Sequence, residues 1–170
     1  MKETGESGRQ GEGFTLIELI VVIFIISLAT ALVMPNLWIS KERALMHEAK
    51  RIGNTLMYIY DEAVGKKQVY ALKLDLSSDT FAYESEKEKR SFSLEDGISF
   101  KNIVIPSMGE IAIGEVIYPL GPLGPEEPIT LHLIKDDSEY TVLFNHLSGR
   151  AKILKGYIIN EDDGQQTAQK

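Results

Sequence analysis

Hydrophobic residues occupy nearly every position from Phe14 to Met34, and Glu18 is the only charge in that run. A helix rises about 1.5 Å per residue, so a run of this length covers the hydrocarbon thickness of a bilayer, roughly 30 Å. The pattern therefore predicts a transmembrane helix over residues 14–35. Residues 1–13 are polar and rich in glycine and glutamate, which is typical of a leader that is removed.

An amphipathic helical pattern follows the apolar run. Apolar residues recur at alternating steps of four and three, which predicts one buried stripe on a helix over residues 36–66. The stripe consists of Leu45, Ala49, Ile52, Leu56, Ile59 and Ala63. The opposite side, expected to face solvent or other subunits, carries Lys41, Arg43, Glu48, Lys50 and Asp61. An independent amphipathic surface helix is the alternative interpretation of this periodicity.

Two local signals bound this helix. Pro35 has no amide hydrogen and clashes with the preceding turn, so we expect a kink where the helix leaves the bilayer. Gly65-Lys66-Lys67 provides a C-terminal stop, since glycine and basic residues are common where helices end.

The period changes to two over residues 67–160, which predicts a β-rich domain. The predicted strands lie within 70–76, 81–83, 92–94, 98–105, 111–118, 129–135, 140–147 and 150–158. Residues 119–128 are too dense in proline and glycine for either element and are predicted to form an extended loop. Residues 161–170 form a polar, acidic tail that is expected to be disordered.

The clearest hairpin joins residues 129–135 to 140–147 through the polar segment 136–139. The expected register pairs Lys135 with Tyr140, Leu133 with Val142 and Leu131 with Phe144. This register places four apolar side chains on one buried face. The whole pattern predicts an α+β protein in which a long N-terminal helix, transmembrane in its first half and amphipathic in its second, packs on an antiparallel β-sheet.

Composition narrows the possible functions. The formal net charge is −7, which argues against a general binder of nucleic acid because no basic surface covers the chain. The sequence has no cysteine, so disulfides and thiolate metal sites are excluded. Stability must therefore come from burial.

Catalytic patterns are missing from the sequence. It contains no nucleotide-binding glycine loop, no HExxH and no GxSxG. The histidines are His47, His132 and His146, and all three are expected at the surface or at strand edges. His132 and His146 fall on opposite faces of the predicted hairpin and so do not converge on a metal. We therefore expect no enzyme activity, no cofactor and no metal site.

The segment Gly13-Phe14-Thr15-Leu16-Ile17-Glu18 lies at the boundary between the polar and apolar regions. It resembles the leader peptidase site of type IV prepilins and type II secretion pseudopilins. The resemblance implies a pilin fold, cleavage by a prepilin peptidase between Gly13 and Phe14, and methylation of the new amino group of Phe14. Glu12 stands where these proteins usually carry a basic residue. An ordinary secretory signal fits poorly, since no Ala-x-Ala pattern follows the apolar run.

Glu18 needs a partner if it lies in hydrocarbon, because a carboxylate there costs about 2.5–3.5 kcal/mol on insertion scales. The resemblance implies that Glu18 of one subunit pairs with the α-amino group of Phe14 on a neighbour during assembly. Such a pair would set the axial register of a filament. The alternative is that Glu18 reaches the nearby membrane interface.

Two later segments carry a narrower resemblance. The first contains Tyr118, Pro119 and Gly121, and the second is Ser148-Gly149-Arg150. This order of residues resembles the H-type minor pseudopilin of type II secretion. The order is an aromatic residue, a proline, a spacer and a glycine, then a strand pair, and then Ser-Gly-Arg. The major pseudopilin fits less well, because its C-terminal calcium-loop pattern is not found.

The resemblance implies a single-pass protein of the bacterial inner membrane with its globular domain in the periplasm. Its implied partners are other pseudopilins or pilins, the prepilin peptidase, the inner-membrane assembly platform, and the lipid bilayer before assembly. The first interpretation is a minor pseudopilin of a pseudopilus that drives protein export across the outer membrane. A minor pilin of a type IV pilus, acting in assembly, adhesion or DNA uptake, is the alternative. The third interpretation is a membrane-anchored domain without a filament role.

Overall fold

The computed structural model describes the backbone of residues 15–159 and the side chains of residues 15–30 and 42–159. These residues form a helix and antiparallel strands, which confirms the predicted α+β class. The elements are α1 (Leu16–Lys66), β1 (Tyr70–Asp75), β2 (Thr80–Glu84), β3 (Lys89–Ser93), β4 (Ser99–Ile105), β5 (Gly109–Ile111), β6 (Glu115–Leu120), β7 (Ile129–Lys135), β8 (Ser138–Asn145) and β9 (Arg150–Lys155). The predicted leader and the predicted acidic tail lie outside the described residues.

The chain divides into two compact units, residues 1–39 and 40–170. Helix α1 begins in the first unit and ends in the second. Its backbone is helical through Pro35, and the kink expected there stays a prediction. The helix ends where the sequence predicts, because Lys67 adopts φ 52° and the amide of Gln68 donates to the carbonyl of Ala63 at 3.1 Å. This bond is the Schellman closure of a helix C-terminus.

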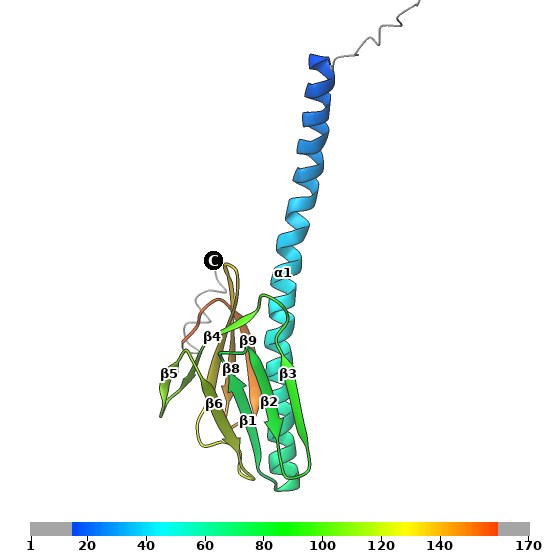
Figure 1. Cartoon of the computed structure of the whole chain (residues 1–170). Helices are drawn as coiled ribbons and strands as arrows, with labels where there is room; N and C mark the ends of the chain where they lie inside the picture. Colours follow the sequence, from blue (N-terminus) through cyan, green and yellow to red (C-terminus); the bar gives the residue numbers. More distant parts are fainter. Residues whose placement is uncertain (1–14, 160–170) are drawn as a thin grey trace, which may run out of the picture. The chain divides into compact units, whose positions relative to one another are not determined.

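The β-strands of the second unit form two antiparallel sheets. One has the order β3-β2-β1-β6 and the other has the order β5-β4-β7-β8-β9. The C-terminal half of α1 runs alongside the sheets (Figure 1). All six residues of the predicted apolar stripe are completely buried in a core to which both sheets contribute. The stripe prediction is therefore confirmed, and the independent surface helix is not what forms.

Close contact between α1 and the larger sheet occurs at Gly53. A Cβ atom at this position would lie 3.2 Å from the Cβ of Ala151 and 3.2 Å from the Cδ1 of Ile153. Both residues belong to β9, so the small glycine allows the helix backbone to approach the strand closely.

The prediction that Glu48 lies on the outward side of the helix, facing solvent or other subunits, was wrong. Its relative exposure is 0%, whereas Arg43, Lys50 and Asp61 are exposed as expected. The reason is that strands of the smaller sheet also pack beside this flank of α1. Arg51, one turn further along, lies over the ring of Phe81 in β2 at 5.3 Å. The buried surface of the helix is thus wider than its apolar stripe.

The predicted register of the hairpin was also wrong. In the structure Lys135 pairs with Ser138, Leu133 with Tyr140 and Leu131 with Val142. The turn contains two residues instead of four, and Asp136 adopts φ 52°, a conformation that aspartate tolerates in tight turns. The error is a slip of two residues, which leaves every side chain on its predicted face because the strand period is two. The predicted buried face is therefore correct.

The predicted loop over residues 119–128 begins two residues too early. Pro119 and Leu120 belong to β6, where they pair with Ala71 and Tyr70 of β1. Strand β6 is at the edge of its sheet, and an edge strand tolerates a proline because its missing amide hydrogen is not required on the free side.

Candidate functional site

The start of α1 is built from the residues of the N-terminal motif. The hydroxyl oxygen of Thr15 accepts a hydrogen bond from the amide of Glu18 at 3.3 Å, and the carbonyl of Thr15 accepts one from Leu19 at 3.2 Å. Thr15 is thus the N-cap residue of the helix, and Glu18 lies three positions later, as in a capping box. Its negative charge in the first turn is favourable, because the helix N-terminus carries partial positive charge.

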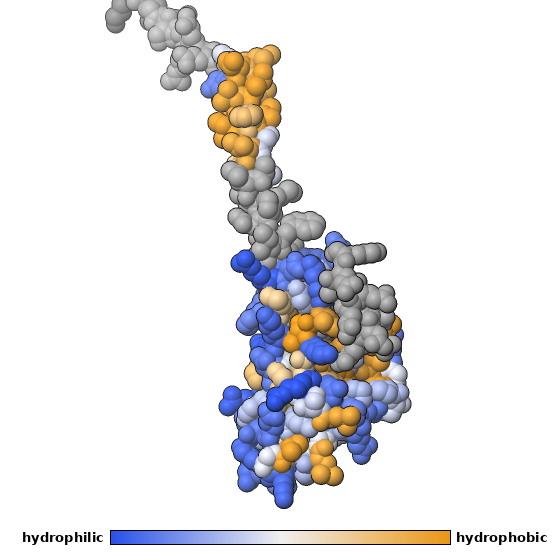
Figure 2. Space-filling model, turned by 180° about the vertical axis from the view of Figure 1, so that it is seen from behind, coloured by the Kyte–Doolittle hydropathy of each residue, from blue (hydrophilic) through white to orange (hydrophobic). Residues whose placement is uncertain are grey.

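Residues 16–30 of α1 present an apolar surface on every side. All side chains of residues 15–30 are exposed, and Leu16 reaches 76%. The hydroxyls of Ser27 and Thr30 donate to the carbonyls of Ile23 and Ile26, each at 2.8 Å, so these polar groups are satisfied within the helix. The face of this segment seen in Figure 2 is mostly hydrophobic. Glu18 is the acidic residue of its first turn.

This surface would be stable only in lipid or against other apolar helices, because the hydrophobic effect disfavours its exposure to water. Within the described residues, no helix is long and apolar enough to cross a membrane. Gly13 and Phe14 lie outside the described residues, so the cleavage, the methylation and the pairing of Phe14 with Glu18 stay predictions.

The loop after the first of the two later motif segments and the turn that contains the second both reach Tyr60 of α1. Tyr118 is buried and its hydroxyl donates to the carbonyl of Glu127, which closes the loop after β6. Within that loop the amide of Gly124 donates to the carbonyl of Gly121 at 2.9 Å. A Cβ atom at Gly124 would lie 2.9 Å from the ring of Tyr60.

Gly149 also lies against the aromatic ring of Tyr60. Its φ is 63°, and an added Cβ atom would approach Tyr60 to 2.2 Å. The hydroxyl of Tyr60 donates to the carbonyl of Leu147 at 3.3 Å, just before the Ser148-Gly149-Arg150 turn. Arg150 itself is exposed at the start of β9. The structure thus brings Gly149 of the second segment and Gly124 of the loop after the first segment together on Tyr60, which sequence reasoning did not single out.

Residues 9–34 match the family described as Prokaryotic N-terminal methylation motif. The motif indicates a type IV pilin-like or pseudopilin protein. It implies processing by a prepilin peptidase and assembly with other pilin subunits, and proteins with this motif are structural filament subunits. No curated protein and no solved structure matches the chain significantly.

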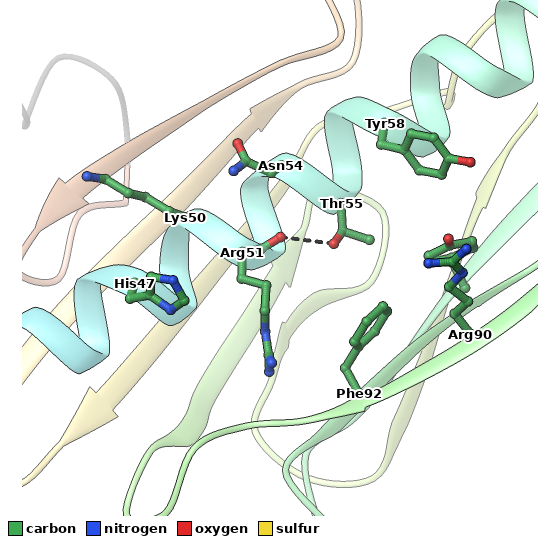
Figure 3. A pocket seen from close by; sticks show the side chains of 9 residues that line it. His47, Lys50, Arg51, Asn54, Thr55, Tyr58, Arg90 and Phe92 are labelled. Atoms are coloured by element: carbon green, nitrogen blue, oxygen red, sulfur yellow. Dashed lines mark hydrogen bonds between the residues drawn. The ribbon is translucent and has the colours of Figure 1, made fainter.

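Sequence reasoning missed a groove beside the C-terminal half of α1. It has a volume of about 610 Å³ and lies between α1 and the smaller sheet (Figure 3). Its lining residues are His47, Lys50, Arg51, Asn54, Thr55, Tyr58, Tyr83, Arg90 and Phe92. Arg51 lies over the ring of Phe92 at 5.7 Å and donates to the carbonyl of Ser93 at 2.5 Å. The residues come from α1, β2 and β3, so no local pattern of the sequence could reveal their proximity.

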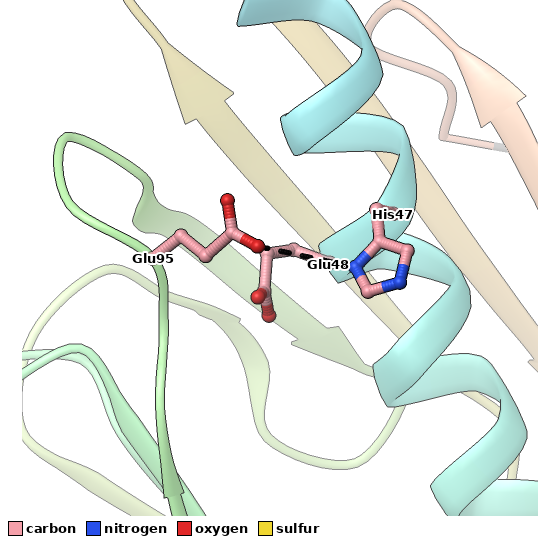
Figure 4. A group of neighbouring side chains, drawn as sticks. All are labelled: His47, Glu48 and Glu95. Carbon is pink, nitrogen blue, oxygen red and sulfur yellow. Dashed lines mark ion pairs between the residues drawn. The ribbon is translucent and has the colours of Figure 1, made fainter.

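A cluster of possible metal ligands lies beside this groove (Figure 4). His47 and Glu48 belong to α1, and Glu95 lies in the loop between β3 and β4. One ligand atom from each of the three lies within 4.8 Å of the others. Burial raises the pKa of Glu48, and the nearby Arg51 guanidinium opposes that rise. Sequence reasoning treated His47 as an isolated surface residue and so did not anticipate this cluster.

The expectation for His132 was wrong, because this side chain is only 1% exposed. Its Nδ1 lies 2.5 Å from the Oδ1 of Asn102, and its Nε2 lies 3.0 Å from the carbonyl oxygen of Ile158. The ring stacks on Tyr157 with 4.0 Å between centroids. The segment after β9 folds back over the outer face of the larger sheet and covers His132, which strand periodicity does not indicate.

Proposed function

We propose that this protein is a minor pseudopilin of a type II secretion system, cleaved before Phe14 and assembled through its N-terminal helix into a pseudopilus that drives protein export. The observation that carries this proposal is the start of α1. A capped helix terminus with an exposed carboxylate at Glu18 is followed directly by a segment whose surface is apolar all round.

This arrangement suits a subunit that passes from one apolar environment to another. Before assembly the apolar half of α1 would span the inner membrane, with the globular domain in the periplasm. In the filament the same surface would pack against the helices of neighbouring subunits. The amphipathic half would remain tied to the β domain through its buried stripe.

Glu18 would direct the assembly step. Cleavage after Gly13 creates an α-amino group on Phe14 close to the helix N-terminus, and this group is a cation that can neutralise Glu18 of a neighbouring subunit. The pair lowers the cost of keeping a carboxylate in an apolar surrounding. Removing Glu18 should therefore affect assembly more than cleavage.

Support for the H-type assignment comes from the later motif segments. Gly149 of the second segment lies against Tyr60, as does Gly124, whose amide donates to the carbonyl of the motif residue Gly121. The loop after β6 and the turn before β9 therefore pack on the same residue of α1. A minor pilin of a type IV pilus remains the alternative function, since both classes of subunit share the N-terminal motif.

The first test is the mass and N-terminal sequence of the protein co-expressed with its prepilin peptidase. We expect a mature chain that begins at methylated Phe14, whereas an uncut N-terminus would contradict the proposal. In the second test, Glu18→Ala should be cleaved like the wild type but incorporated poorly into filaments. Glu86→Gln is the matched control, because it removes an exposed carboxylate from a turn of the β domain.

A deletion in the native host separates the two functions. Loss of protein export with intact pili would support the pseudopilin assignment. Loss of pili or of DNA uptake, with normal export, would favour the minor pilin.

A further inference from the structure

Glu48, on the part of α1 packed against the β domain, is an unusually buried charged group. Its side chain is 1% exposed, although a carboxylate is rarely buried without compensation. Arg51 approaches it, with 2.7 Å between Nη2 of Arg51 and Oε2 of Glu48. Oε2 of Glu48 is thus engaged by Arg51, whereas Oε1 has no hydrogen-bond partner among the described residues. A buried acceptor in this state is destabilising and calls for a further ligand.

Two other ligand groups face the same point. Nδ1 of His47 lies 4.0 Å from Oε1 of Glu95, and both side chains are largely exposed. Figure 4 shows the ion pair of His47 and Glu95 with the side chain of Glu48 beside it. The three residues thus form a partly organised ligand set. Glu48 is buried and held by the core, whereas His47 and Glu95 are exposed and can adjust their rotamers.

From this geometry we propose that His47, Glu48 and Glu95 bind a divalent transition-metal ion of the Zn²⁺ type. One imidazole nitrogen and two carboxylate oxygens are ligands that Zn²⁺ accepts, with water in the fourth position. Ligands of a tetrahedral zinc ion lie roughly 3.4 Å apart, given bonds of about 2.1 Å. The ligand atoms here lie within 4.8 Å of one another, so small rotations of His47 and Glu95 would close the site.

Arg51 is compatible with this proposal. It contacts Oε2 of Glu48, which leaves Oε1 for the ion. Ligating carboxylates commonly have such an outer partner, which fixes their orientation. The positive charge of Arg51 lowers the affinity for a cation, so we expect moderate binding rather than that of a closed structural zinc site.

Bound metal would connect the loop between β3 and β4 to α1. Glu95 belongs to that loop, and His47 and Glu48 belong to the helix. The ion would thus stabilise one wall of the cationic groove lined by Lys50, Arg51 and Arg90. This role does not depend on the proposed function, because the site lies wholly within the β domain and the part of α1 packed on it.

The test uses the full-length protein in detergent, freed of metal with a chelator and dialysed. Titration with ZnCl₂ in a calorimeter should show one saturable site, and the melting temperature should rise with Zn²⁺ concentration. Ca²⁺ and Mg²⁺ should bind much more weakly, since they prefer oxygen ligands. His47→Ala and Glu95→Gln should each weaken Zn²⁺ binding at least about tenfold.

Both variants change exposed residues, so they should fold like the wild type. His146→Ala and Glu86→Gln are the matched controls, because they remove the same groups outside the cluster and should bind Zn²⁺ normally. Absence of saturable Zn²⁺ binding would overturn the proposal and leave Glu48 and Arg51 as a structural ion pair. Equal binding by the wild type, His47→Ala and Glu95→Gln would overturn it as well.

Discussion

The ring of Tyr60 on α1 lies against the α-carbon of Gly149 in the turn before β9, so closely that a Cβ atom at position 149 would approach the ring to 2.2 Å. Real Cβ atoms do not tolerate such a distance, and Gly149 also has a φ of 63°, which side chains other than glycine rarely adopt. The helix and the last strand of the larger sheet are therefore fixed to each other through a glycine that cannot be replaced without movement of Tyr60.

Gly149→Ala should strongly destabilise the β domain. We expect a loss of about 2–4 kcal/mol in the free energy of unfolding, from overpacking of about 1–3 kcal/mol plus backbone strain of about 1 kcal/mol. Chemical denaturation followed by near-ultraviolet circular dichroism measures this loss. Gly156→Ala is the matched control, because Gly156 has φ 91° but nothing within 4 Å of its added Cβ atom. Equal losses in the two variants would show that the contact with Tyr60 is unimportant.

His132 should make stability depend on pH. Burial lowers its pKa below the ordinary value of 6.5, and the opposing effects of the Ile158 carbonyl, Glu139 and Glu110 are smaller, while Lys101 acts with burial. The neutral ring is therefore favoured in the folded state. Its contribution is fully present above about pH 6.5 and is lost as the pH falls from there through the lower folded pKa.

The measurement compares melting temperatures of the wild type and His132→Gln between pH 7.5 and pH 5. The wild type should be the more stable of the two at pH 7.5, and this advantage should shrink as the pH falls. His146→Gln serves as the control for the loss of a histidine, and it should keep the pH dependence of the wild type. A difference between the wild type and His132→Gln that is constant with pH would contradict the prediction.

Thr141 should hold the segment after β9 in place. Its hydroxyl donates to the carbonyl of Gly156 at 2.6 Å and accepts from the amide of Ile158 at 3.1 Å. Thr141→Val keeps the shape but removes both bonds and leaves a buried amide unsatisfied, at a cost of about 1–3 kcal/mol. Hydrogen exchange at Ile158 should accelerate more than exchange in β7. Thr130→Val, a change on the neighbouring strand, should leave exchange at Ile158 unchanged.

Leu56 tests the contribution of the apolar stripe. It is completely buried, so Leu56→Ala should cost about 2–5 kcal/mol through lost transfer energy and a cavity. Val64→Ala, on the same helix at 38% exposure, should cost well under 1 kcal/mol. The denaturation midpoints of the two variants measure these two losses of stability. Similar losses in both would mean that the helix depends little on its packing against the sheets.

Local patterns determined much of the secondary structure. The stripe from Leu45 to Ala63 was predicted correctly, because a 3.6-residue period is a property of the helix itself and shows directly in the order of residues. The end of α1 at Lys66 and most strand positions followed from equally local signals. The N-terminal motif was also recognisable from the sequence, since its residues are adjacent in the chain.

The sequence could not determine which distant segments become neighbours. The pairing of β1 with β6 brings Tyr70 opposite Leu120, and this depends on the balance of loop entropy against packing over the whole domain. The burial of Glu48 and His132 follows from elements that fold over them from elsewhere in the chain. The contact of Tyr60 with Gly149 and the ligand cluster at His47 arise in the same way, because proximity in the folded domain leaves no periodic trace in the order of residues.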